Sequence, residues 1–158
     1  MKPLIAAALL AATLTACGGT QEAAAGLEHI EVEDAWVRLP TVPGRPGAAY
    51  FHIRTDVAPA ALLKVSTPIA RRAELHESMK GAGGMMSMTP LKQVTVAADD
   101  SLTFAPGGKH AMLFDLNPAL KAGGTVPLTL HFASGATRTA KALVVAPGGA
   151  APPSEGRP

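Results

Sequence analysis

The alternation of apolar and polar residues is clearest in the stretch VPLTLHF at residues 126–132. One parity of this stretch holds Val126, Leu128, Leu130 and Phe132, and the other holds Pro127, Thr129 and His131. Successive side chains of a β-strand point to opposite faces of the sheet, so a period of two predicts a half-buried strand. Residues 126–132 therefore predict a strand with one face in a hydrophobic core.

Shorter runs with the same period occur along most of the chain, and Gly and Pro separate them. They lie at residues 29–39, 49–54, 94–96 and 137–146, with turn signals at 106–108 (Pro-Gly-Gly) and 123–124 (Gly-Gly). In the first run the apolar parity changes between Val32 and Val37, which a β-bulge near Asp34 would explain. Many short strands with frequent turns predict an all-β fold, either a sandwich or a Greek-key barrel.

Composition excludes several classes of protein. The 158 residues suit one ordinary domain, and 14 Lys and Arg against 12 Asp and Glu give a net charge of only +2. A nucleic-acid partner is not expected, because phosphate binding needs an excess of basic charge on one face. The single cysteine excludes an intrachain disulfide framework and a thiolate zinc cluster. No Gly-x-Ser-x-Gly motif or phosphate loop occurs, so we do not expect an enzyme.

The first residues resemble a bacterial lipoprotein signal. An apolar segment, LIAAALLAATL at residues 4–14, precedes the lipobox-like Leu14-Thr15-Ala16-Cys17. We expect cleavage before Cys17 and acylation of its sulfur, which anchors the chain in a membrane facing the periplasm. Gly18, rather than Asp, after the cysteine favours the outer membrane. The alternative is a plain secretory signal with a chance cysteine.

Composition also divides the chain into four segments. The mature domain is flanked by stretches rich in small residues, Gly and Pro, which are typical of flexible chain. The predicted segments are a signal peptide at 1–16, the lipidated Cys17 with a flexible tether at 17–27, a β-sandwich domain at 28–146, and a disordered Pro/Gly-rich tail at 147–158.

Methionine is concentrated in one part of the mature chain. Apart from Met1, all the methionines lie between residues 79 and 112, and His76 and His110 bracket all of these except Met112. Methionine that only fills a core would be spread over many strands. Thioether sulfur is a soft, neutral ligand that favours Cu(I), and imidazole is a second donor that copper accepts. The cluster therefore predicts a Cu(I) site.

Strand geometry suggests how such a site could form. His110 and Met112 are one residue apart, so they share a face of a strand, and we expect this face to continue into the core at Phe114 and Leu116. His76 ends another predicted strand, at 73–77. The Gly-rich stretch KGAGGMMSM, residues 80–88, is expected to be a flexible loop that folds a sulfur over the site. Whether Met79, Met85 or Met86 assists is left open.

The spacing of these residues resembles that of the periplasmic copper chaperone family, PCuAC. The family's ligand pattern is reproduced in this chain. After His76 come one residue and ten further residues before Met88; twenty-one residues then precede His110, and one residue separates His110 from Met112. Glu77 stands where many members have an additional methionine. The similarity covers about residues 28–146 and extends to the stretches DAWVR (34–38), AELHE (73–77), PGGKHAML (106–113) and LTLHF (128–132).

The resemblance implies a cupredoxin-like β-sandwich that binds Cu(I) through His76, Met88, His110 and Met112. It also implies a chaperone that delivers copper in the periplasm to the copper centre of cytochrome c oxidase, together with thioredoxin-fold copper carriers. Three alternatives remain: a copper-sequestering or copper-homeostasis lipoprotein without a dedicated oxidase client, a copper oxidase, and a metal-free adhesive sandwich. Storage and delivery use the same ligands, so the sequence does not separate them.

Overall fold

The structure is a computed structural model that describes residues 30–153. The predicted signal peptide, Cys17 and the tether lie outside these residues. The described part consists of strands joined by short loops, with one short 3-10 element, η1 (Ala82–Gly84), and no helix long and apolar enough to cross a membrane. The strands are β1 (Ile30–Arg38), β2 (Gly47–Thr55), β3 (Ala60–Ser66), β4 (Ala70–Lys80), β5 (Met86–Leu91), β6 (Val94–Val96), β7 (Asp100–Phe104), β8 (Lys109–Leu116), β9 (Thr125–Phe132) and β10 (Thr137–Val145).

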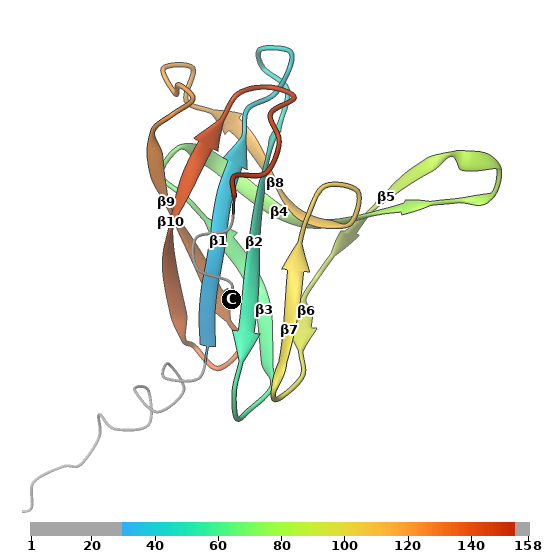
Figure 1. Ribbon diagram of the computed structural model, residues 1–158, viewed down its shortest axis with the longest axis vertical. Coiled ribbons are helices and arrows are strands. Elements are labelled where there is room, and N and C mark those ends of the chain that lie inside the picture. The colour runs from blue at the N-terminus through green and yellow to red at the C-terminus, as the bar shows by residue number, and fades with distance from the viewer. Residues whose placement is uncertain (1–29, 154–158) are drawn as a thin grey trace, which may run out of the picture.

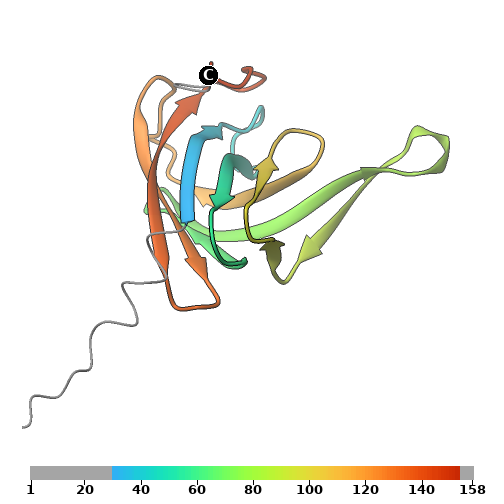
Figure 2. The ribbon, with the colours of Figure 1, turned by 60° about the horizontal axis from the view of Figure 1, so that its bottom comes forward.

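The strands form a single sheet that curls around one core (Figures 1 and 2). Its order is β5-β4-β8-β2-β1-β10-β9-β3-β6, and β7 also pairs with β2. All neighbours are antiparallel except β1 and β10, which run parallel. The prediction of an all-β fold is confirmed.

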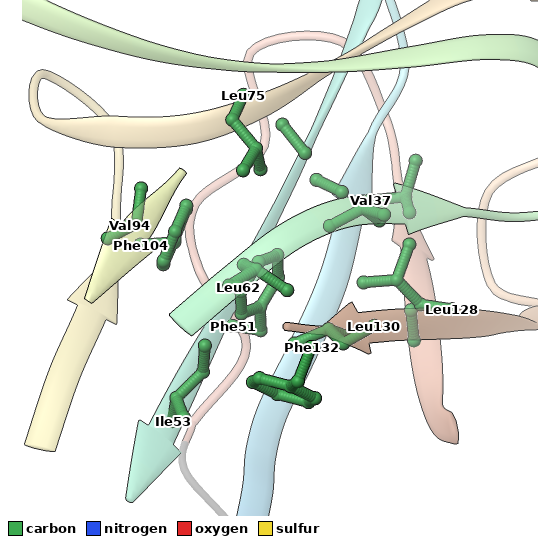
Figure 3. Packing of buried hydrophobic residues seen from close by; sticks show 14 of the residues in the cluster. Val37, Phe51, Ile53, Leu62, Leu75, Val94, Phe104, Leu128, Leu130 and Phe132 are labelled. Carbon is green, nitrogen blue, oxygen red and sulfur yellow. The ribbon is translucent and has the colours of Figure 1, made fainter. Parts of the chain in front are cut away.

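The core is filled by alternate residues of nearly every strand (Figure 3). Val126, Leu128, Leu130 and Phe132 are all buried, as the period of two in residues 126–132 predicted. Phe51 of β2 stacks on Phe104 of β7 with 4.3 Å between ring centroids. Burial of a large apolar side chain contributes about 1.5–3 kcal/mol to folding, so this cluster is the main stabilising element of the domain.

The predicted bulge in β1 is confirmed and decides where two aromatic residues lie. The register of β1 on β2 shifts between Glu33 and Trp36, and Asp34 has a positive φ of 51°. After the shift Val37 enters the core, while Trp36 pairs with Tyr50 on the outer face of the sheet. Trp36 is buried, but it packs outside the main core.

The β4–β5 hairpin extends well beyond the rest of the sandwich (Figures 1 and 2). The prediction of a loop over 80–88 and of a strand ending at residue 77 was wrong here. β4 continues to Lys80 and β5 begins at Met86, with regular pairing from Lys80 opposite Met86 to Leu75 opposite Leu91. Two glycines with positive φ, Gly83 and Gly84, let the chain reverse within the short turn. The flexible residues make the turn, while the methionines after them continue as a strand.

Candidate metal centre

β8 presents His110 and Met112 on one face, as predicted, but this face is not the core face. Ala111 and Leu113 are fully buried in the core, and Met112 and Phe114 are half-buried on the other side of the sheet. Only Leu116 packs against the core, after Asp115 with its positive φ of 53°. The expectation that this face continues into the core at Phe114 was wrong, because β8 is apolar on both parities and alternation could not decide between them.

β4 places His76 directly opposite His110. The two residues are cross-strand partners, with 6.1 Å between ring centroids and 28° between ring planes. His110 is buried, and the His76 side chain is only 12% exposed. Cross-strand partners share a face of the sheet, so both rings lie on the outer face. The structure thus brings together two histidines that are far apart in the sequence.

Hydrogen bonds occupy one nitrogen of each ring. His110 Nδ1 lies 2.9 Å from the carbonyl oxygen of Gly108, and His76 Nε2 lies 3.1 Å from Oε2 of Glu74. Both partners are acceptors, so these nitrogens carry the protons and donate. The lone pairs are then on His110 Nε2 and His76 Nδ1. His76 Nδ1 is buried and has no hydrogen-bond partner in the described structure, which leaves it available to a ligand.

Glu74 is a part of the site that the sequence reasoning missed. Its carboxylate accepts a hydrogen bond from His76 and forms an ion pair with Arg72, whose guanidinium carbon lies 4.0 Å from the centroid of the Phe114 ring. The signal was present in the sequence, because Glu74 is two residues before His76 and shares its face of the strand. A carboxylate that fixes the tautomer and orientation of a histidine is a common support for a metal ligand.

The two candidate sulfur ligands lie on either side of the histidine pair. Met112 is the cross-strand partner of Glu74, next to His76 on the same face. Met88 pairs with Ser78 of β4, so it is a diagonal neighbour of His76, a separation of about 7–8 Å. Met88 is 51% exposed, whereas Met112 is half-buried. The four predicted residues therefore share one face of the adjacent strands β8, β4 and β5.

A wall of aromatic side chains borders the site on its β2 side. Tyr50 lies between Trp36 and His110, with centroid distances of 4.4 and 6.4 Å. The Arg38 guanidinium donates a hydrogen bond of 2.6 Å to the Tyr50 hydroxyl. Burial raises the pKa of the Tyr50 phenol, and the positive charge of Arg38 partly opposes this shift. This wall shields His110 from water, while the β5 side of the site remains open.

The other methionines lie further out. Met79 pairs with Ser87 and so points to the opposite face of the hairpin. Met85 is in the turn and 76% exposed. Met86 shares the face of Met88 but pairs with Lys80, one step further from the sandwich. The hairpin carries these three sulfurs away from the two histidines.

The donor set fits a soft monovalent metal better than a hard one. The described residues contain no group of three or more His, Cys, Asp or Glu that could hold a metal ion. Calcium and magnesium require several oxygen ligands, and zinc favours thiolate, imidazole and carboxylate. Two neutral imidazoles and two thioethers are donors that Cu(I) prefers. Among these metals, Cu(I) is the one that the donors on this face suit best.

Comparison with known sequences finds a matching family and a related protein. Residues 30–144 match the family model described as "Putative lipoprotein LpqE-like". A protein of Leifsonia xyli subsp. xyli (strain CTCB07) described as "Putative lipoprotein Lxx21020" is 28% identical to this chain over 111 residues. These residues make up 70% of this chain and 66% of that protein.

Solved structures with the same fold include PCuAC domains. The copper-bound PCuAC domain of PmoF2 has a TM-score of 0.62 at 24% identity, over 75% of this chain and 94% of that one. The Cu(I) form of DR1885 from Deinococcus radiodurans has a TM-score of 0.54 at 30% identity, over 80% of this chain and 85% of that one. The predicted cupredoxin-like β-sandwich is confirmed. This chain therefore belongs to the LpqE-like family, and it shares its fold with PCuAC domains.

Proposed function

We propose that this protein is a copper chaperone that binds one Cu(I) ion through His76, Met88, His110 and Met112. The observation that carries the proposal is the placement of His76 opposite His110, with 6.1 Å between the rings and both predicted sulfur ligands on the same face. The Cu(I) form of DR1885, a relative of 30% identity, supports the choice of metal.

The hydrogen bonds of the two rings determine which atoms donate in this proposal. His76 binds through Nδ1 and His110 through Nε2, because Glu74 and Gly108 engage the other nitrogens. Fixing both tautomers before the metal arrives reduces the ordering that binding requires. All four donors are neutral, so the occupied site keeps the single positive charge of the ion.

The unequal burial of the ligands suits a protein that must release its metal. His110 lies against the Tyr50 wall, whereas Met88 is 51% exposed on the projecting hairpin. In the proposed chaperone an incoming ligand reaches the ion from the exposed side of the site, where Met88 lies. Because two thioethers take part, Cu(I) is favoured over Cu(II), and because the site lacks the thiolate of a blue-copper centre, the proposed task is transport of the ion without electron transfer.

The proposed client is the copper centre of cytochrome c oxidase, with thioredoxin-fold copper carriers as further partners. We further propose that Cys17 is acylated and holds the domain at the periplasmic side of the outer membrane. The lipoprotein description of the matching family supports an anchor in the cell envelope. Accumulation of the protein in the membrane fraction, and its loss after Cys17→Ala, would test the anchor.

An anaerobic Cu(I) titration of the purified protein tests the site. We expect about one tightly bound equivalent in the wild type and a marked loss of affinity in His76→Ala, Met88→Ala, His110→Ala and Met112→Ala. Matched controls are Met79→Ala, on the other face of the hairpin, and His131→Ala, whose ring bonds Ser66 on β3. Equal losses in the controls and in the four ligand variants would contradict the proposal.

A transfer experiment separates delivery from storage. The Cu(I)-loaded protein is mixed with the apo copper-binding domain of an oxidase, and the metal content of each is measured after separation. A chaperone transfers most of its copper, whereas a sequestering protein retains it. The exposure of Met88 favours transfer.

A further inference from the structure

The β4–β5 hairpin carries an unusual concentration of exposed sulfur. Of the seven large hydrophobic side chains that are exposed in the described residues, four are methionines of this hairpin and its turn. They are Met79 at 51%, Met85 at 76%, Met86 at 55% and Met88 at 51%. Single exposed apolar residues are ordinary. Four thioethers on one projecting hairpin beside a proposed copper site call for a chemical explanation.

The pairing register separates these methionines by face. Met88 lies opposite Ser78 and Met86 opposite Lys80, so both share the face of His76. Met79 lies opposite Ser87 and therefore faces the other side. Residues two apart on a strand are about 7 Å apart, a distance that two flexible methionine side chains can close around one ion. Met86 is about 13–14 Å along the hairpin from the level of His76, too far to share an ion with it.

We infer that Met86 and Met88 together form an outer Cu(I) position through which the ion enters and leaves the site. The inference rests on the proposed function, because it assigns Met88 to both positions. When the ion moves outward, its bonds to the imidazoles and to Met112 break and a bond to Met86 sulfur forms, while the bond to Met88 persists. Copper remains Cu(I) throughout, and no proton moves.

The outer position should bind Cu(I) more weakly than the inner one, for two reasons. It has two thioether donors and no imidazole. Its neighbour across the strands is Lys80, a cation that repels a bound metal ion. An intermediate position in a transfer route must be weak, because tight binding there would trap the ion. Met86 therefore affects copper exchange much more than equilibrium affinity at the inner site.

Methionine methyl signals provide a direct test. The protein is labelled with ¹³C at the methionine methyl groups, and each signal is assigned by its loss in a Met→Leu variant. In the wild type the first equivalent of Cu(I) should shift the signals of Met88 and Met112 and leave Met79 unshifted. If Met112 does not respond, the proposed four-ligand site is wrong, whatever happens at Met86.

Removal of the inner site isolates the outer one. In the double variant His76→Ala/His110→Ala, residual Cu(I) binding should shift Met86 and Met88 together, and the further change Met86→Leu should abolish it. Met79→Leu in the same background is the control and should leave the residual binding intact. Residual binding that survives Met86→Leu, or its complete absence in the double variant, would overturn the outer position while leaving the proposed function in place.

A second measurement covers the case in which the double variant does not fold, as judged by circular dichroism. In protein loaded with one equivalent, a Cu(I) chelator should then remove the ion more slowly from Met86→Leu than from the wild type or Met79→Leu, with the affinity of the inner site unchanged. Equal removal rates in Met86→Leu and Met79→Leu would likewise overturn the inference.

Discussion

The two faces of the β4–β8 pair have opposite roles, although the same two strands supply both. The inner face contributes Leu75, Ala111 and Leu113 to the core, and the last two are fully buried. The outer face carries His76, His110 and Met112. A strand alternates its side chains with a period of two, so one rigid backbone can hold a core on one side and a ligand set on the other. Stability and metal binding should therefore respond to separate substitutions.

The largest effect is expected on the inner face. Leu113→Ala removes a fully buried side chain and should lower the free energy of unfolding by about 3 kcal/mol, through lost burial and the cavity left behind. Urea denaturation would measure the change. The Cu(I) affinity of the folded variant should stay within about threefold of the wild type, since the outer face is untouched. A parallel loss of affinity would show that the two faces are coupled.

Substitution of Met112, the neighbour of Leu113 on the outer face, should change Cu(I) affinity strongly and stability little. Met112→Leu preserves the approximate volume of the side chain, so the free energy of unfolding should change by less than about 1.5 kcal/mol. The variant loses a thioether ligand, and Cu(I) affinity should fall on the order of 100-fold, equivalent to about 2.7 kcal/mol. Competition with a chromophoric Cu(I) chelator measures it. Unchanged affinity would remove Met112 from the site.

A smaller effect is expected from the carboxylate that supports His76. Glu74→Ala removes the acceptor of the His76 hydrogen bond and should lower Cu(I) affinity about tenfold, the usual range for such supporting groups. Glu77→Ala is the matched control, because Glu77 is on the same strand but pairs with Lys109. The idea fails if the two variants lose the same amount.

The smallest effect concerns the aromatic wall. Tyr50 is the only tyrosine in the chain, so a titration of absorbance at 295 nm reports this phenol alone. Burial raises the pKa of Tyr50, so its midpoint should lie above the value of about 10 seen in denaturant. The contribution of this pKa difference to the free energy of unfolding is fully present below about pH 10, and it is lost as the pH rises through the pKa of the folded state. Tyr50→Phe should remove this alkaline loss, and a midpoint at or below 10 in the folded protein would contradict the expected burial.

Much of the fold could be predicted because local patterns and global packing agree. The alternation in residues 126–132 corresponds to strand β9. The change of parity near Asp34 corresponds to the bulge in β1. The face of β8 could not be predicted, because Ala111 and Leu113 compete with Met112 and Phe114 for the core. What settles that competition is the pairing of β8 with β4 and β2, which no local pattern contains.

The candidate site was predictable only in part, for a related reason. The spacing of His76, Met88, His110 and Met112 named the residues, and the structure places them on one face of neighbouring strands. The sequence did not show that the glycine-rich stretch is the turn of a hairpin, since glycine weakens the strand signal. Nor did it show that Glu74 contacts His76, a contact that depends on side-chain conformation.

The parallel pairing of β1 with β10 has a consequence for how the domain matures. Trp36 pairs with Leu143, so the first strand of the sandwich obtains one of its two neighbours only from the last. Such distant contacts are slow to form, and they cannot form at all while the end of the domain is still being synthesised. The proposed ligands on β4, β5 and β8 are all made earlier than β10. The sheet that carries the proposed metal ligands is therefore complete only after β10 has been made and has paired with β1.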